Sequence, residues 1–146
     1  MPWEPQGPNP SQQQFLTASK AHRWVGFVGG VRCGKSRAGV ERGMSLMAHS
    51  PGIHGAILRK FDEDLWDSCV VPFLEWCPKS MIKDYPSKKN KRIVWHNGAD
   101  VTFKGMYTRQ GRVQKLGSLN YGWIELDEAE ELERKDFLVA SARLSQ

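Results

Sequence analysis

The sequence lacks any apolar run long enough to cross a membrane, and its proline-rich first ten residues lack the apolar segment of a secretory signal. Cysteine is scarce. Cys33, Cys69 and Cys77 are the only three, and their spacing fits neither a metal site nor a disulfide framework. No internal repeat is visible. These absences argue against a membrane-spanning or disulfide-rich secreted protein, so we expect reduced thiols in a cytoplasm.

What remains is the composition of a globular domain with a basic excess. The 146 residues are 40% hydrophobic and 25% charged, which supplies enough apolar side chain for one buried core. Lys and Arg number 21 against 16 Asp and Glu. This balance favours a polyanionic partner, although many soluble proteins carry a similar net charge. We therefore expect one folded domain.

A glycine-rich segment at residues 29–36 is the most informative motif. It fits the pattern G-x-x-x-x-G-K-[ST], in which backbone N–H groups surround phosphate oxygens. The segment consists of Gly29, Gly30, Val31, Arg32, Cys33, Gly34, Lys35 and Ser36. Lys35 is expected to reach the β- and γ-phosphates, and Ser36 to ligate Mg²⁺. The motif therefore predicts binding of a nucleoside triphosphate.

The residues on either side of this motif fit a strand and a helix. The apolar segment Trp24–Val28 predicts a short buried strand. Ser36–Ala48 predicts a helix, whose N-terminus adds positive charge to the anion site.

A second motif, Trp123–Glu128, is a mostly apolar strand that ends in two carboxylates. Asp127, at the end of the strand, is expected to hold the Mg²⁺ shell, and Glu128 to polarise an attacking water. Strands often end in acidic turns, so this pattern alone does not indicate a metal site. It does so in combination with the phosphate-binding motif. The pair favours a hydrolase over a kinase or a GTP switch, because a Glu beside the metal-binding Asp has the geometry to activate water.

The other elements alternate between helices and strands, which predicts an α/β fold with a parallel sheet as its core. Asn97-Gly98, between Arg92–His96 and Ala99–Lys104, is the strongest two-residue hairpin signal available. The remaining expectations are a helix from Ser11 as N-cap to about Ser19, a strand at Ile53–Arg59, a helical stretch at Phe61–Trp76 interrupted by Pro72, a loop at Met106–Asn120, a strand at Tyr121–Leu126, and a helix at Phe137–Leu144 with Leu138 and Ala142 on its apolar face.

Two details bear on which nucleotide is bound. The amide of Gln12 can pair with both the donor and the acceptor edge of adenine, but a surface glutamine on a capped helix is an equally good interpretation. The sequence contains no N-K-x-D run, which would specify guanine. Both details favour ATP. Arg32, inside the loop, can read the γ-phosphate or respond to an acidic group of a neighbour.

Together these motifs resemble the ATPase domain of tailed-bacteriophage terminase large subunits, over nearly the whole chain. Gln12 with Phe15 and Leu16 is similar to the adenine motif of that family, and residues 29–36 are similar to its Arg-bearing Walker A motif. The hairpin around Asn97-Gly98 and the segment Lys115–Leu119 are similar to further family segments. Gly122–Glu131 resembles the family's Walker B region most specifically.

The resemblance implies an ASCE-like P-loop NTPase fold, a parallel sheet flanked by helices with an inserted β-hairpin. It implies a motor that translocates double-stranded DNA with ATP and Mg²⁺, as a homo-oligomeric ring with small-terminase and portal partners in the host cytoplasm. Catalytic roles would fall to Glu128, Lys35 and Arg32. The family's coupling motif and nuclease domain do not follow Walker B here, so residues 1–146 are expected to be the N-terminal part of a motor domain, with one central strand missing.

Several interpretations stay open at the sequence level. The basic residues Lys79, Lys83, Lys88, Lys89, Lys91 and Arg92 can contact DNA phosphates or form a solvated loop. Arg112 and Lys115, followed by Arg143, are candidates for a finger that reaches the ATP of a neighbouring subunit. The alternatives to a packaging motor are a helicase-like, nucleic-acid-stimulated ATPase and a nucleotide-binding module without turnover.

Overall fold

The computed structural model describes residues 10–28, 34–108, 110 and 120–144. The chain forms two compact units, Met1–Arg42 and Gly43–Gln146, each with its own internal packing. None of the helices within these described ranges has the length and apolar character needed to cross a membrane.

The first unit contains helix α1, Pro10–Ala21, and the start of helix α2, Lys35–His49. Helix α1 begins at Pro10, so Ser11 lies inside the helix rather than at its N-cap. This start is compatible with proline, because the first turn of a helix does not use its backbone N–H groups. The predicted helix at Ser36–Ala48 is confirmed and is one residue longer at each end.

The predicted buried strand at Trp24–Val28 is wrong. The segment forms no strand, and Trp24 and Val28 are 45% and 97% exposed. Its aromatic contact is local, since the ring of Phe27 meets that of Phe15 on α1 edge-on, with centroids 5.5 Å apart. A strand needs at least one neighbouring strand to satisfy its backbone hydrogen bonds, and no described strand pairs with this segment.

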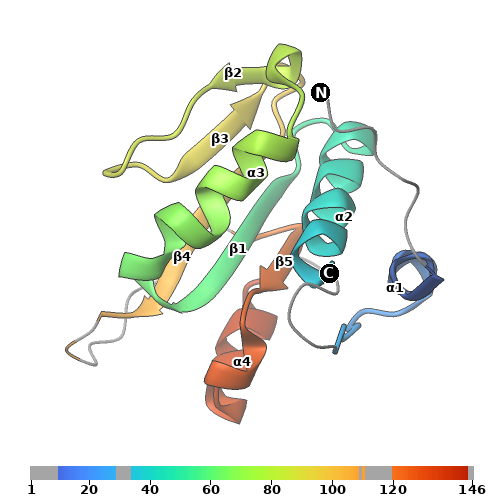
Figure 1. The fold of residues 1–146 in the computed structure, drawn as a ribbon, viewed down its shortest axis with the longest axis vertical. Helices are drawn as coiled ribbons and strands as arrows, with labels where there is room; N and C mark the ends of the chain where they lie inside the picture. The colour runs from blue at the N-terminus through green and yellow to red at the C-terminus, as the bar shows by residue number, and fades with distance from the viewer. Residues whose placement is uncertain (1–9, 29–33, 109, 111–119, 145–146) are drawn as a thin grey trace. The chain divides into compact units, whose positions relative to one another are not determined.

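The second unit is built on a five-stranded sheet in the order β2-β3-β4-β1-β5 (Figure 1). The strands are β1 His54–Phe61, β2 Ile82–Asp84, β3 Arg92–Trp95, β4 Asp100–Tyr107 and β5 Trp123–Leu126. Strand β1 pairs in parallel with both β4 and β5, while β2 and β3 are antiparallel. The α/β class and the parallel core with an added hairpin are therefore observed, in a mixed and open sheet.

The hairpin between β3 and β4 forms where Asn97-Gly98 predicts it, but its loop is one residue longer. The backbone N–H of Trp95 donates to the carbonyl of Ala99 at 2.8 Å, which closes a loop of three residues. Gly98 has a φ of +85°, whereas Asn97 keeps a negative φ. This is the geometry of a type I turn followed by a left-handed glycine rather than of a two-residue turn. The side chain of Asn97 donates to the carbonyl of Met47 at 2.8 Å and so ties the turn to the end of α2.

The helical stretch after β1 divides into short pieces. A 3₁₀ turn at Asp62–Asp64 and a π-helical turn at Trp66–Val70 precede helix α3, Val71–Trp76. Pro72 lies in the first turn of α3, so the predicted interruption occurs there because proline cannot donate in a continuous helix.

The last helix, α4, spans Arg134–Ala142 and starts three residues before the predicted position. A capping box accounts for this start, because Asp136 accepts a hydrogen bond from the backbone N–H of Glu133 at 2.9 Å. The predicted apolar face is wrong: Leu138 is 61% exposed, and the buried residues of α4 are Asp136 and Ala140.

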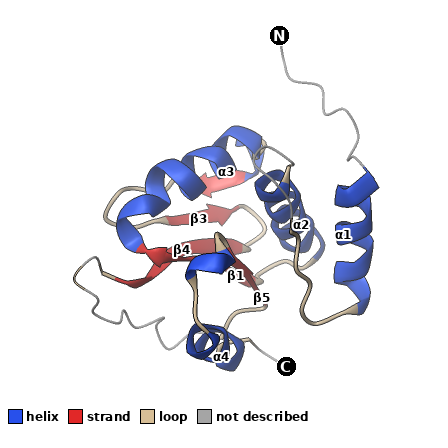
Figure 2. Ribbon diagram, turned by 60° about the horizontal axis from the view of Figure 1, so that its bottom comes forward, coloured by secondary structure: helices blue, strands red, loops and turns tan. Residues whose placement is uncertain are grey.

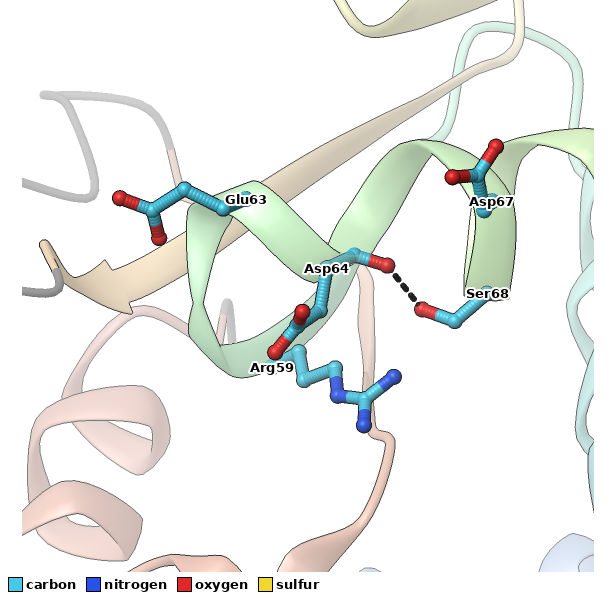
Figure 3. A pocket seen from close by; sticks show the side chains of 5 residues that line it. All are labelled: Arg59, Glu63, Asp64, Asp67 and Ser68. Carbon is cyan, nitrogen blue, oxygen red and sulfur yellow. Dashed lines mark hydrogen bonds between the residues drawn. The ribbon is translucent and has the colours of Figure 1, made fainter.

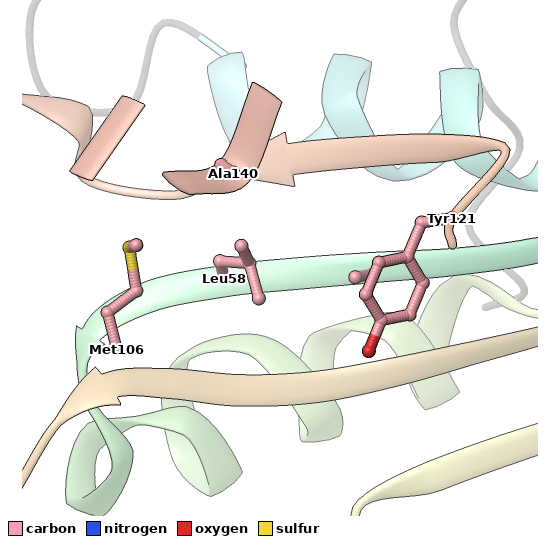
Figure 4. Close-up of a cluster of buried hydrophobic side chains, with 5 residues drawn as sticks. Leu58, Met106, Tyr121 and Ala140 are labelled. Atoms are coloured by element: carbon pink, nitrogen blue, oxygen red, sulfur yellow. The ribbon is translucent and has the colours of Figure 1, made fainter. Parts of the chain in front are cut away.

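The two faces of the sheet are covered by different helices, as Figure 2 shows for α3 and α4. Alternate residues of β1 point to opposite faces. Leu58 packs in a buried cluster with Met106 of β4, with Tyr121 and with Ala140, which lies on α4 (Figure 4). On the other face, Phe73 of α3 meets Phe103 of β4 edge-on, with ring centroids 5.7 Å apart, and the ring of Trp123 lies against Gly55 and against Gly43 of α2. This second face also carries the acidic residues described below.

Candidate functional site

In the first unit, the end of the glycine-rich motif opens helix α2. Gly34 has a φ of +84°, a left-handed conformation that favours glycine, and its carbonyl accepts the first hydrogen bond of the helix from Ala38 at 3.0 Å. Lys35 and Ser36 therefore occupy the first turn of α2, where backbone N–H groups and the helix dipole favour an anion.

Helix α1 brings Gln12 to this helix start. The side-chain amide of Gln12 donates to the carbonyl of Gly34 at 3.0 Å. The structure thus brings together two residues that the sequence analysis singled out separately. This bond shows that Gln12 supports the loop, while its recognition of adenine stays a prediction.

Some predicted residues lie outside the described ranges. These are Gly29, Gly30, Val31, Arg32 and Cys33 of the motif, and the finger candidates Arg112 and Lys115 with the segment up to Leu119. Arg143, the third finger candidate, follows α4 directly, and its carbonyl accepts a hydrogen bond from the backbone N–H of Tyr121 at 2.7 Å.

In the second unit, Asp127 continues β5 beyond its last paired residue. Its backbone N–H donates to the carbonyl of Leu58 at 2.9 Å, so Asp127 lies at the carboxyl end of the parallel strands. One carboxylate oxygen, Oδ2, accepts a hydrogen bond from the thiol of Cys69 at 3.4 Å. Burial and the nearby charge of Asp127 raise the pKa of Cys69 far above its ordinary value, so this thiol stays protonated and acts as a donor.

Glu128 has the only positive φ among the described non-glycine residues. Its φ of 51° and ψ of 52° place it in the left-handed region, directly after Asp127. A hydrogen bond with Glu130, followed by partial burial, raises the pKa of Glu128 above its ordinary value. Left-handed non-glycine residues carry a conformational cost and concentrate at functional sites, so this backbone marks the acidic pair as a candidate site.

Arg59, at the end of β1, is a residue that the sequence analysis did not assign to the site. Its guanidinium lies 4.0 Å from Asp127 and 3.5 Å from Glu131, and its side chain is mostly buried. Burial opposes its charge, but the attraction of these carboxylates outweighs burial and raises the pKa of Arg59. A basic residue that closes an apolar strand was the available signal, because such a position meets the ends of neighbouring parallel strands.

Glu125 is a second residue that the sequence analysis left without a role. It shares the sheet face of Asp127, two residues along β5, and its Oε2 atom is buried without a hydrogen-bond partner. Burial, followed by the charge of Asp127, raises the pKa of Glu125 to about 8. A carboxyl group inside an otherwise apolar strand was the signal in the sequence, because an acid is seldom buried there without a reason.

An open pocket of about 360 Å³ lies beside these residues, lined by Arg59, Glu63, Asp64, Asp67 and Ser68 (Figure 3). The hydroxyl of Ser68 donates to the backbone carbonyl of Asp64, which fixes the turn between β1 and α3. Three carboxylates line the pocket against one guanidinium, so its lining repels a bare phosphate and favours groups that donate hydrogen bonds or carry positive charge.

We compared the chain with known protein families, with curated proteins and with solved structures. No family model matches it, and neither of the other two comparisons gives a match. Each unit therefore has a candidate site that stands on its own residues. The first unit has the helix start at Gly34–Ser36, and the second has the acidic strand end at Asp127-Glu128.

Proposed function

We propose that this chain binds Mg-ATP through residues 29–36 and hydrolyses it with Asp127 and Glu128, as the ATPase of a motor that packages viral DNA. The observation that carries the proposal is the acidic end of β5. Asp127 and a left-handed Glu128 follow each other at the carboxyl edge of a parallel sheet, the edge at which open α/β sheets bind their ligands.

The start of α2 supports the nucleotide part of the proposal. Gly34 has the left-handed conformation that such a loop requires, and the first turn of a helix of 15 residues follows it with Lys35 and Ser36. Backbone donors and a lysine at one helix N-terminus are the chemistry that a triphosphate needs. Ser36 and Asp127 would supply the oxygen ligands that Mg²⁺ prefers, and the bound ion would compensate phosphate charge.

In the proposed reaction, a water oxygen attacks the γ-phosphorus while the Glu128 carboxylate accepts a proton from that water. The bond between the γ-phosphorus and the β–γ bridging oxygen breaks, and ADP leaves with the electron pair. Lys35 and Arg32 balance the charge on the phosphate oxygens. Arg59, 4.0 Å from Asp127, holds the Asp127 carboxylate in position.

Lys35→Ala tests the phosphate contact. Loss of a charge-assisted contact is worth roughly 1.5–3 kcal/mol, so we expect the Kd for a fluorescent ATP analogue to rise about 10- to 100-fold. Lys135→Ala is the matched control, because this lysine is on α4 with a side chain 68% exposed. Equal affinity of the parent and Lys35→Ala would contradict the assignment of the loop.

Glu128→Gln tests the chemical step, because an amide of nearly the same shape cannot accept the proton. We expect unchanged binding of the analogue and a turnover lower by roughly 10²- to 10⁴-fold in a phosphate-release assay. Glu75→Gln, an exposed position on α3, controls for the loss of one charge. Undiminished hydrolysis in Glu128→Gln would remove Glu128 from this role.

The DNA part of the proposal has its own readout. We expect double-stranded DNA to stimulate ATP turnover by the parent protein without strand separation. Unwinding of a forked duplex would instead favour a helicase-like ATPase. Nucleotide binding with no turnover in any of these conditions would favour a binding module.

A further inference from the structure

The basic excess of the protein is concentrated in one short stretch. Six of its 21 Lys and Arg, but only one of its 16 Asp and Glu, lie between residues 79 and 92. The rest of the chain therefore carries 15 residues of each sign. The stretch covers a 3₁₀ turn at Lys79–Met81, β2, the loop that follows it and the first residue of β3.

Half of these basic side chains have structural partners. Lys91 pairs with Asp62 at 3.3 Å, and Arg92 pairs with the buried Asp100 at 2.5 Å. Lys79 donates to a backbone carbonyl of α3 at 2.8 Å. These three residues fasten the β2–β3 hairpin to the unit that carries it.

The other three, Lys83, Lys88 and Lys89, are exposed, and none of them forms an ion pair with any residue the structure describes. Tyr85 lies between them in the sequence and is 58% exposed, although most large apolar side chains of this unit are buried. We call these four residues the lysine tip. It presents three ammonium groups and one aromatic ring.

The loop that carries the lysine tip has a defined shape. The backbone N–H of Ser87 donates to the carbonyl of Asn90 at 2.9 Å, and the N–H of Asn90 donates back to the Ser87 hydroxyl at 3.0 Å. Lys88 and Lys89 are the two central residues of this closed turn. A preformed turn lowers the entropy lost when its side chains bind a partner.

Exposed lysines at this position could also serve edge protection or membrane attachment, but the structure fits both roles less well. β2 is an edge strand, and lysines on an edge protect a sheet from aggregation. Lys83 lies on β2, but Lys88 and Lys89 lie beyond it. An anionic lipid surface also attracts lysines, but membrane attachment needs apolar side chains that insert, and the nearby Ile82 and Ile93 are buried.

We propose that the lysine tip binds single-stranded nucleic acid, with Lys83, Lys88 and Lys89 on backbone phosphates and Tyr85 stacked on an unpaired base. Cations that follow a phosphate backbone and an aromatic ring that stacks on a base are the two features of sequence-tolerant single-strand binding. The tip is proposed to bind a single strand, whereas the proposed motor moves a duplex, and binding by the tip needs no ATP. Failure of one is therefore distinguishable from failure of the other.

The first test removes charge. Fluorescence anisotropy of the full chain with a labelled oligothymidine, without nucleotide, gives the Kd at several salt concentrations. The logarithm of the association constant falls as the logarithm of the salt concentration rises. We expect K88A/K89A to make this slope shallower by about 0.7 for each lysine removed. K88R/K89R keeps the charge and should keep the slope. R134A/K135A removes the same charge from exposed positions on α4 and should change nothing. An equal loss of binding in R134A/K135A would overturn the proposal.

The second test removes the ring. Tyr85→Ala is expected to raise the Kd for the single strand by roughly tenfold or more, with a much smaller effect on a duplex of equal length. Tyr85→Phe keeps the ring and should bind within about twofold of the parent, since stacking does not need the hydroxyl. Equal effects of Tyr85→Ala on both DNA forms would overturn the proposal. It would also be overturned if K88A/K89A abolished binding to phosphatidylserine vesicles while DNA binding persisted. Self-association of K88A/K89A with unchanged DNA binding would overturn it as well and would assign the lysines to edge protection.

Discussion

The hydrogen bonds of individual carboxylates distinguish residues that stabilise the fold from residues of the candidate site. Asp136 and Asp100 are each 2% exposed, and each has donors: Tyr107 and the Glu133 backbone for Asp136, Arg92 and His54 for Asp100. A buried carboxylate with its donors satisfied stabilises the fold. Glu125 differs, because its Oε2 atom is shielded from solvent and unpartnered. That contrast favours a role for Glu125 toward a ligand of the acidic strand end.

The hydrogen bond from Tyr107 to Asp136 yields a prediction at this scale. Tyr107→Phe removes the donor and leaves a buried carboxylate less well satisfied, so we expect a loss of about 1–2 kcal/mol in the free energy of unfolding at neutral pH. This bond to Asp136, followed by burial, raises the pKa of Tyr107 from 10.0 to about 12.

The sign of the pH dependence follows from that shift. A raised pKa in the folded state gives a stabilisation that is complete below about 10 and is lost as the pH rises to about 12. Urea unfolding at a series of pH values should show the parent and Tyr107→Phe converging over this range. A constant difference between them up to pH 12 would show that the hydrogen bond is not the cause.

At the scale of the element, the sequence predicted the helices, strands and turns that depend on local residues. It missed those that depend on contacts with distant segments. The Asn97-Gly98 turn, the helix after Gly34 and the strand ending at Asp127 follow from turn propensity, capping and hydrophobic pattern. Trp24–Val28 does not form a strand, because strand pairing depends on other segments of the chain and the local sequence does not show whether these are available. Strand β2 was missed because a strand of three residues with one buried side chain leaves no periodic pattern.

The site shows the same division. The motif residues Lys35, Ser36, Asp127 and Glu128 are recognisable because their chemistry is contained in short segments. Arg59 and Cys69 reach Asp127 from other elements, so their contacts with Asp127 become visible only in the fold.

The fit of Trp123 between two elements gives a second prediction. A Cβ atom at Gly55 of β1 would lie 2.0 Å from the indole ring, and one at Gly43 of α2 would lie 2.6 Å from it. Gly55→Ala should therefore cost about 1–3 kcal/mol through overpacking. Gly26→Ala is the control, since nothing lies within 4 Å of its added Cβ.

Thermal or urea unfolding measures both variants. Adding Trp123→Phe to Gly55→Ala should recover part of the loss, because the smaller ring leaves room for the methyl group. A loss from Gly55→Ala that is independent of the residue at position 123 would place the strain elsewhere.

At the scale of the whole molecule, the strands of the sheet differ in how well neighbouring strands protect their backbone hydrogen bonds from opening. β1 has a hydrogen-bonded neighbour on each side, whereas β5, which leads into Asp127 and Glu128, is an edge strand. The parallel strands carry the acidic site at their carboxyl ends, and the basic hairpin extends the opposite side of the sheet beyond β4. The candidate catalytic residues therefore follow the less protected strand, as is common for elements that move or bind ligands.

Amide hydrogen exchange tests this order across the chain. We expect the amides of β1 to exchange most slowly, because they open only when the unit unfolds, and those of β5 to exchange faster. Trp24–Val28, which forms no strand, should exchange about 1,000-fold faster than β1 or more, and as fast as the exposed loop between β2 and β3. Mass spectrometry of peptides from the intact chain gives all of these rates in one experiment, with that loop as the unprotected reference. Exchange at Trp24–Val28 as slow as in β1 would mean that this segment does pair as a strand in solution, as its apolar sequence alone predicts.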